Sequence, residues 1–376
     1  TTISAEWDQA TTQAALEVAG KIDASLRDLA NLDRDSSKHE QQLKDFCTQF
    51  VERAFRRPLS DEQRSVYIDR QFAEATDART AVKRVVILTL KSPRFLFPGA
   101  ADGQFDDHRT AAWLALALWD SIPDRELREV AAKGELSSRE QIAAQTERML
   151  ADDRAKSKLK LFFQQWLSFD RLHEFEKARE LYPDFNEQIA ADLRVSLDLF
   201  LDDVVWSDRS DFRNLLLSNE IYLNGRLAKY YGYDLPEDAP FQKVALEPDV
   251  RAGLLTHPYL MAGYAYTDSS SPIHRGVFLT RNVLGRFLKP PPIAVAPTPV
   301  DLAPDMTTRE RVTIQTRETL CMSCHGMIND LGFSLEQFDA VGRFRKQERG
   351  RDVDASGRYV KRSGEEVRFE GARELA

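Results

Sequence analysis

The sequence predicts an all-α protein built from several helical domains. Apolar residues recur with the helical period along nearly all of the chain before residue 240. No run of alternating apolar and polar residues in that part is long enough to indicate a strand, although short hairpins remain open. The chain has 376 residues, of which 42% are hydrophobic, and this is enough to bury two or three cores. We expect domains at residues 1–98, 99–240 and 241–376.

The first domain is expected to hold three helices after an amphipathic N-terminal segment. One helix ends before Pro58 and places Cys47 on its apolar face, where a thiol acts as a small, inert core residue. Ser60 and Gln63 form a capping box that starts the next helix. An apolar stripe from Val82 to Leu90 predicts the third.

The second domain follows a small, polar stretch at residues 99–107 that is typical of a linker. Ser138 and Gln141 predict the start of one helix. A long helix over residues 189–205 is expected to pack against a stripe of large apolar and aromatic core residues. The stripe consists of Leu159, Phe162, Phe163, Trp166 and Leu167.

The third domain contains a proline-rich strap at residues 289–304. Such a run favours extended polyproline conformation and cannot lie inside a helix. Two interpretations remain open. The strap is either a spacer between domains or a segment that wraps a cofactor and excludes water.

Charge and hydropathy exclude two classes of partner. The net charge is −8, and Lys and Arg are scattered among acidic residues, which argues against binding to nucleic acid. The longest apolar run, Ala111 to Trp119, is about half of the roughly 20 residues that a membrane-spanning helix needs. We therefore expect no transmembrane segment. The oligomeric state is not indicated.

The chemistry of the chain is concentrated in the motif Cys-Met-Ser-Cys-His at residues 321–325. C-x-x-C-H is the signature of c-type haem attachment. Two thiols three positions apart on one helix, Cys321 and Cys324, can both reach the vinyl groups on one edge of a porphyrin. His325 then projects its imidazole toward the iron as the proximal ligand. The motif predicts one covalent haem c.

Two other chemistries use paired cysteines. A zinc site would need two more ligands at short spacing, but no Cys or His follows His325 in the sequence. A thioredoxin-like dithiol requires a βαβ setting, whereas the surroundings of Cys321 and Cys324 are predicted to be helical. Zinc binding and dithiol chemistry both remain open, but haem attachment is favoured over them.

Residues 321–345, CMSCHGMINDLGFSLEQFDAVGRFR, resemble the haem-bearing segment of the planctomycete-type cytochrome c family. This family consists of large secreted bacterial proteins with several domains of unknown function. The resemblance covers roughly residues 40–370. It is carried by RAFRRPLS at 53–60, SPRFLF at 92–97, LWDSIPD at 118–124, MLADDR at 149–154, LNGRLAKYYG at 223–232, GLLTH at 253–257 and SPIHRG at 271–276.

The resemblance implies a cytochrome-c-like haem domain after helical bundles, in a periplasmic or extracellular protein. One departure concerns the residues after the motif. Where the family has Asp or Asn followed by Pro, this chain has Asn329 followed by Asp330, so the turn expected there is in doubt. The sequence ends at Ala376, whereas relatives commonly continue, and a fragment of a longer protein is one reading.

The ligand on the opposite side of the iron decides what such a haem does. Met327 is the last methionine and lies too close to His325 to cross the ring. Met306, at the end of the strap, is the first distal candidate because an extended strap can cross a haem face. The other candidates are Met261, His274 and His257, each of which has an ordinary structural role as the alternative.

Charged residues follow the motif. Glu336 and Asp339 lie three positions apart, so they share a face if their segment is helical. A salt bridge to Arg343 or Arg345 is favoured over a catalytic pair. Arg345 is alternatively a partner for a haem propionate, since its guanidinium suits bidentate contact with a carboxylate.

Three functions are consistent with these residues. The first is electron transfer to a redox partner protein by a haem with two protein ligands. The second is a haem enzyme (oxidase, dehydrogenase or peroxidase) with an open distal site, with polysaccharides among the candidate substrates. The third is a scaffold that the haem holds together. The first is favoured, and no catalytic residue is assigned.

Overall fold

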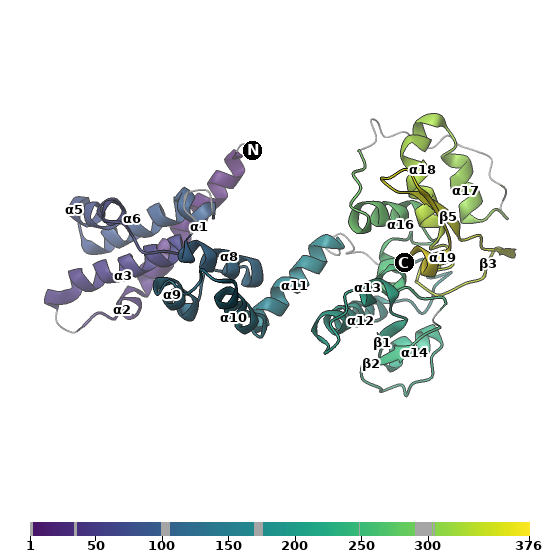
Figure 1. Ribbon diagram of the computed structural model, residues 1–376, viewed down its shortest axis with the longest axis horizontal. Helices are drawn as coiled ribbons and strands as arrows, with labels where there is room; N and C mark the ends of the chain where they lie inside the picture. Colours follow the sequence, from purple (N-terminus) through teal and green to yellow (C-terminus); the bar gives the residue numbers. More distant parts are fainter. Residues whose placement is uncertain are drawn as a thin grey trace. The chain divides into compact units, whose positions relative to one another are not determined.

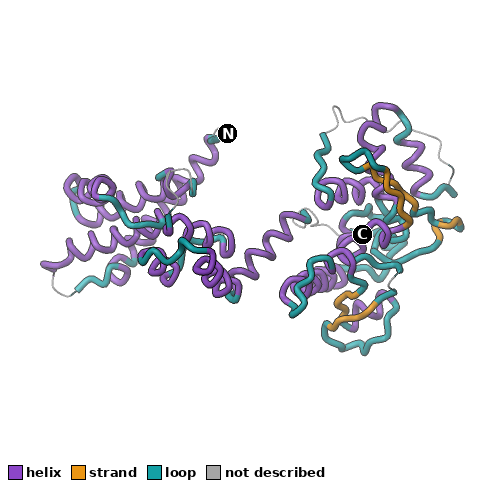
Figure 2. Tube along the Cα trace, in the orientation of Figure 1, coloured by secondary structure: helices purple, strands orange, loops and turns teal. Residues whose placement is uncertain are grey.

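The computed structural model describes residues 3–33, 36–98, 106–168, 176–247, 249–289, 303 and 305–376. Within these residues the chain is mostly helical, and its strands form short hairpins (Figure 1, Figure 2). The chain divides into two compact units, Thr1–Leu161 and Phe162–Ala376. The expectation of a mostly helical, multi-domain protein is confirmed. The boundaries expected at residues 98 and 240 stay a prediction.

Unit 1 consists of helices joined by short turns. Its elements are α1 (Ala5–Ala24), α2 (Leu26–Leu29), η1 (Ser36–Lys38), α3 (His39–Phe55), α4 (Asp61–Arg64), η2 (Ser65–Asp69), α5 (Arg70–Glu74), α6 (Ala78–Lys91), α7 (Pro93–Leu96), α8 (Asp107–Trp119), α9 (Arg125–Ala132), α10 (Arg139–Leu150) and α11 (Asp153–Trp166), which ends within unit 2.

Local capping chemistry sets where these helices begin. Ser60 and Gln63 form the predicted capping box at the start of α4. Ser138 and Gln141 form a second capping box at the start of α10, also as predicted. In both, the serine hydroxyl accepts from a backbone N–H that has no partner within the helix.

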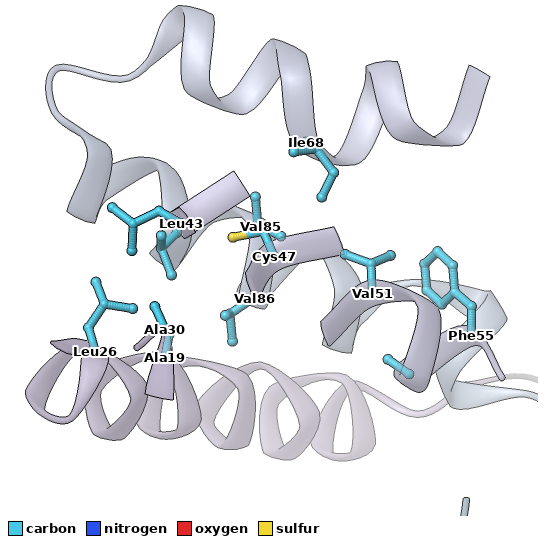
Figure 3. Close-up of a cluster of buried hydrophobic side chains, with 12 residues drawn as sticks. Ala19, Leu26, Ala30, Leu43, Cys47, Val51, Phe55, Ile68, Val85 and Val86 are labelled. Atoms are coloured by element: carbon cyan, nitrogen blue, oxygen red, sulfur yellow. The ribbon is translucent and has the colours of Figure 1, made fainter. Parts of the chain in front are cut away.

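The core of unit 1 forms around α3, where Cys47 lies among apolar side chains from α1, α3, α6 and η2 (Figure 3). Cys47, Val51 and Val85 are completely buried. This burial confirms the prediction of a core thiol. It also raises the pKa of Cys47 to about 12, because the thiolate would lose its hydration.

Unit 2 combines short helices with hairpins. Its elements are α12 (Glu187–Trp206), α13 (Asn214–Leu217), β1 (Glu220–Leu223), α14 (Gly225–Tyr231), β2 (Gln242–Ala245), η4 (Gly253–Thr256), α15 (Pro258–Gly263), α16 (Pro272–Phe278), η5 (Leu279–Val283), α17 (Thr308–Gln315), α18 (Thr319–Phe333), β3 (Gln347–Glu348), β4 (Arg351–Asp352), β5 (Ser356–Val360), β6 (Glu366–Glu370) and α19 (Gly371–Leu375).

The all-α expectation left short hairpins open, and the described residues contain three of them. Strands β1 and β2, β3 and β4, and β5 and β6 pair as antiparallel two-stranded sheets. In β6, the inward-facing Val367 and Phe369 alternate with charged residues, and Gly364 adopts φ +87° in the turn before it. This alternation is the sequence pattern of a half-buried strand.

Two expectations concern residues outside those described. Most of the linker, residues 99–105, and most of the strap, residues 290–302 and 304, belong to this group. In the described part of the chain, no helix combines the length and apolar character needed to cross a membrane.

Candidate functional site

The Cys-Met-Ser-Cys-His motif lies in the first half of α18. The two halves of this helix differ in burial. Cys321, Cys324 and His325 are half-buried and their neighbours are exposed, whereas the helix is buried from Ile328 to Phe333 except for the half-buried Asp330. The second half therefore anchors α18 in unit 2, and the first half presents the motif.

Two glycines allow α18 to cross α16 at very close range, and the two helices lie side by side in Figure 1. A Cβ at Gly332 would lie 1.9 Å from the Pro272 carbonyl oxygen, and a Cβ at Gly276 would lie 2.0 Å from that of Ile328. Both distances are shorter than any tolerated contact. Only glycine permits this crossing, which fixes α18 against α16.

A relay of hydrogen bonds orients the imidazole of His325. The Thr316 hydroxyl donates to the Val312 carbonyl oxygen at 2.7 Å, so it accepts from the Asn329 amide nitrogen, which lies 2.8 Å away. The Asn329 amide oxygen then faces His325 Nδ1 at 2.9 Å and accepts its proton. The neutral ring carries its proton on Nδ1, which leaves the lone pair of Nε2 available to a metal.

The donor set of the motif fits the requirements of a c-type haem. Cys321 and Cys324 are free thiols, and neither is fully buried. Leu320 and Met322, which flank Cys321, are 65% and 43% exposed and provide apolar contact area beside the thiols. When bound, the haem would be held by the two cysteines and by His325 Nε2.

A zinc site needs a larger set of protein ligands. Structural zinc is bound by four Cys, His or carboxylate side chains. Among the residues that the structure describes, no group of three or more His, Cys, Asp or Glu side chains is arranged to hold a metal ion. Among the described residues, no further His, Cys, Asp or Glu side chain therefore lies beside Cys321, Cys324 and His325 in a metal-binding arrangement.

Two of the proposed distal ligands, His257 and Met261, lie in the core of unit 2. Met261 is completely buried, and His257 is 3% exposed. The Nδ1 atom of His257 accepts from the Tyr259 N–H, and Nε2 lies 3.4 Å from the Ser196 hydroxyl. Both nitrogens of the ring thus have protein partners, and the structure does not bring His257 to the motif.

The other two distal candidates are His274, which lies in α16, and Met306, which lies just before α17. Pro272 and Gly276 mark the side of α16 that faces α18, so His274 lies on roughly the opposite side, where its ring is 5.0 Å from that of Tyr266. Met306 precedes α17, whereas Thr316 follows it, about 12 Å further along the helix axis. No described contact joins either side chain to His325.

Arg345 takes part in a buried ion-pair network. Its guanidinium lies 3.2 Å from the carboxylate of Glu336 and 3.5 Å from that of Glu348. Arg275, which is completely buried, lies 3.5 Å from the other oxygen of Glu336. The predicted salt bridge between Glu336 and Arg345 is confirmed. A propionate contact by Arg345 stays a prediction, since its described partners are protein groups.

Sequence reasoning missed the role of Asn329 and Thr316. The pattern was available, because a His and an Asn four positions apart share one helix face. The doubt about a turn at this position is also resolved. With Asp330 in place of proline, the backbone keeps its N–H, and α18 continues to Phe333.

Three family models match successive parts of the chain. PSD5, a protein of unknown function (DUF1595), matches residues 42–98. PSD4, a protein of unknown function (DUF1592), matches residues 105–233. PSCyt3, a protein of unknown function (DUF1588), matches residues 251–348, which include the motif and α16 to α18. The comparison with curated proteins and that with solved structures find no match.

Fold and site together define a mostly helical, multi-domain protein with a cytochrome-like C-terminal segment. The chain belongs to the planctomycete cytochrome c family. This assignment agrees with the resemblance detected in residues 40–370.

Proposed function

We propose that this protein is a c-type cytochrome that carries one covalent haem c and transfers electrons in the periplasm or outside the cell. Cys321 and Cys324 attach the haem by thioether bonds, and His325 is its proximal ligand. The observation that carries this proposal is the relay from Thr316 through Asn329, which leaves His325 Nε2 as the basic nitrogen. When bound, the haem supplies a one-electron iron couple.

The rest of the site acts by positioning these three residues. The crossing of α16 and α18 at Gly276 and Gly332 holds the buried half of α18 in place. Because the motif precedes this half on the same helix, its thiols and imidazole keep a fixed spacing. A fixed ligand limits the reorganisation that accompanies a change in iron charge, which favours an electron carrier. The expected partner is a redox protein.

A haem enzyme with an open distal site is the second candidate. One observation favours it: His257 and Met261 are held in the core, and His274 lies on the far side of α16 from α18. Of the four distal candidates, Met306 is then the one not held elsewhere by described side-chain contacts. If Met306 does not bind the iron, the distal position is free for a small ligand or substrate.

Optical spectroscopy of the protein, produced with a cytochrome c maturation system, tests both candidates. We expect a c-type spectrum whose haem resists acid-acetone extraction. A reduced spectrum unchanged by carbon monoxide supports the electron carrier. If the spectrum of Met306→Ala does change with carbon monoxide, Met306 is identified as the distal ligand. A shift with carbon monoxide supports the enzyme. Haem that is absent or fully extractable contradicts both.

A further inference from the structure

Unit 1 contains a cavity of about 290 Å³ at the C-terminal end of α3, next to α9. Four arginines and one glutamate line it: Arg53, Arg56, Arg57, Arg128 and Glu52. His108 from α8 and Gln49 from α3 complete the polar lining. This concentration of positive charge is unexpected in a chain whose net charge is −8.

The four guanidinium groups differ in their partners. Arg57 forms two contacts of 3.0 Å with the carboxylate of Asp106 and is thereby neutralised. Arg56 donates instead to backbone carbonyl oxygens, including that of Ala54 at 3.2 Å. Arg128 likewise donates to the Pro123 carbonyl oxygen at 2.8 Å. Among the described residues, none of Arg53, Arg56 and Arg128 forms an ion pair with a carboxylate.

Burial disfavours the charged forms of Arg56 and Arg128, and the carboxylate of Glu52 in the lining offsets only part of the positive charge. Burial lowers the pKa of Arg56. Burial also lowers the pKa of Arg128, and repulsion from the guanidinium of Arg53 adds to the effect, while the carboxylates of Asp124 and Glu129 offset part of it. Arg125, on the same helix as Arg128, shows the reverse: its hydrogen bond to Glu129 raises its pKa. Arg53 and Arg128 therefore repel each other, and the desolvated charge of Arg56 lines the same cavity, so a bound anion would stabilise all three.

The cavity has room for more than a bare ion. Space for one water molecule corresponds to roughly 10–15 Å³ on the same measure, far less than the volume found here. A smaller adjoining cavity of about 40 Å³ shares Arg56, Arg57 and His108 and adds the side chain of Trp113, which is 50% exposed. An anionic group placed among the arginines would thus have space and an aromatic surface beside it for an attached organic part.

We propose that this cavity binds a doubly charged tetrahedral oxyanion, of the phosphate or sulfate class, between Arg53, Arg56 and Arg128. Guanidinium groups from α9 and the end of α3 present several donors to one centre, which suits an anion with acceptor oxygens on all sides. The source is either the free ion or an ester of a larger molecule. The proposal concerns unit 1 and does not depend on haem binding.

Calorimetric titration of the 376-residue protein tests the site, with sodium phosphate, sodium sulfate and glucose 6-phosphate as probes and chloride at equal ionic strength as the reference. We expect binding of phosphate or sulfate and a rise in melting temperature of about 2–5 °C at saturation. Tighter binding of glucose 6-phosphate identifies an ester as the source, and equal binding identifies the free ion. Binding of none of the probes overturns the proposal.

Two variants and a matched control locate the site. Arg53→Gln and Arg128→Gln are expected to weaken binding by about tenfold or more, because each removes a charge-assisted contact. In chloride alone, both should be at least as stable as the parent protein, since they relieve repulsion. Arg125→Gln lies on the same helix as Arg128 but is exposed and paired with Glu129, so it should bind as the parent does. An equal loss in Arg125→Gln would place the anion elsewhere.

Discussion

Cysteine and histidine, the two reactive residue types of this protein, occur both in buried cores and in the partly exposed motif. Cys47 lies in an apolar core in unit 1, and His257 is enclosed in unit 2 with both ring nitrogens engaged. Cys321, Cys324 and His325 share one half-exposed stretch of helix. The comparison shows that residue type alone does not make a site. Access distinguishes the motif from the core residues, and so does the hydrogen-bond pattern of His325, which engages Nδ1 and leaves Nε2 without a partner among the described residues.

Replacing the motif cysteines should have the largest effect, and replacing the core residue Cys47 provides the comparison. Cys321→Ser with Cys324→Ser removes both proposed thioether bonds, so we expect complete loss of haem that resists acid-acetone extraction. Cys47→Ser should keep the attached haem. It should instead lower the free energy of unfolding by about 1–3 kcal/mol, because a hydroxyl is placed in an apolar core. The measurements are haem content by mass spectrometry and denaturant unfolding. Attached haem in the double variant would refute thioether attachment at this motif.

The two halves of α18 provide the next contrast. Gly332→Ala places a Cβ 1.9 Å from the Pro272 carbonyl oxygen, so α16 and α18 must separate. We expect a loss of about 3 kcal/mol in the free energy of unfolding of unit 2. Gly326→Ala, in the exposed half, meets only Met322 Cε at 3.7 Å and should gain up to about 1 kcal/mol from helix propensity. Urea unfolding followed by circular dichroism measures both. Equal effects would show that the crossing is not tight.

These residues also show what the sequence could predict. The motif, the capping boxes at Ser60 and Ser138 and the buried position of Cys47 follow from local rules, because each depends on neighbours a few positions away. The Gly276 and Gly332 crossing and the ion pair of Glu336 with Arg275 depend on contacts between distant segments. A single sequence carries no periodic pattern for such contacts. The hairpin at β5 and β6 was predictable in principle, since Val367 and Phe369 alternate with charged residues.

The enclosure of His257 predicts a dependence of stability on pH. Burial, and secondarily the charge of Arg251, lowers the pKa of His257 from 6.5 to about 3. Between these values the unfolded chain takes up a proton that the folded chain does not. The contribution of the neutral His257 to the free energy of unfolding is therefore fully present above pH 6.5. On acidification it is lost, by up to about 1.4 kcal/mol per pH unit.

His257→Asn tests this dependence because the asparagine oxygen can still accept from the Tyr259 N–H. We expect the variant to be less stable at pH 7 and to show a shallower loss of stability between pH 6.5 and pH 5. The relevant unfolding transition is the one that Gly332→Ala shifts. His39→Asn, in unit 1, is the control and should leave the slope of that transition unchanged. An unchanged slope in His257→Asn would mean that this ring is accessible to protons in the folded state.

The smallest expected effect comes from replacing Asn329. It tests whether the hydrogen bond that orients His325 matters beyond the presence of the imidazole itself. Asn329→Leu removes the acceptor for the Nδ1 proton, so the imidazole becomes less basic and stabilises oxidised iron less. The reduction potential should rise by about 50 mV, while haem content stays unchanged. Asn329→Asp keeps an acceptor of greater charge and should lower the potential instead. In haem-free protein, nitrogen NMR of the ring should show the Nδ1–H tautomer, and Asn329→Leu should shift it toward Nε2–H. Opposite shifts in potential from Leu and Asp cannot arise from a merely loosened helix, whereas shifts of the same sign would show that Asn329 acts only through packing.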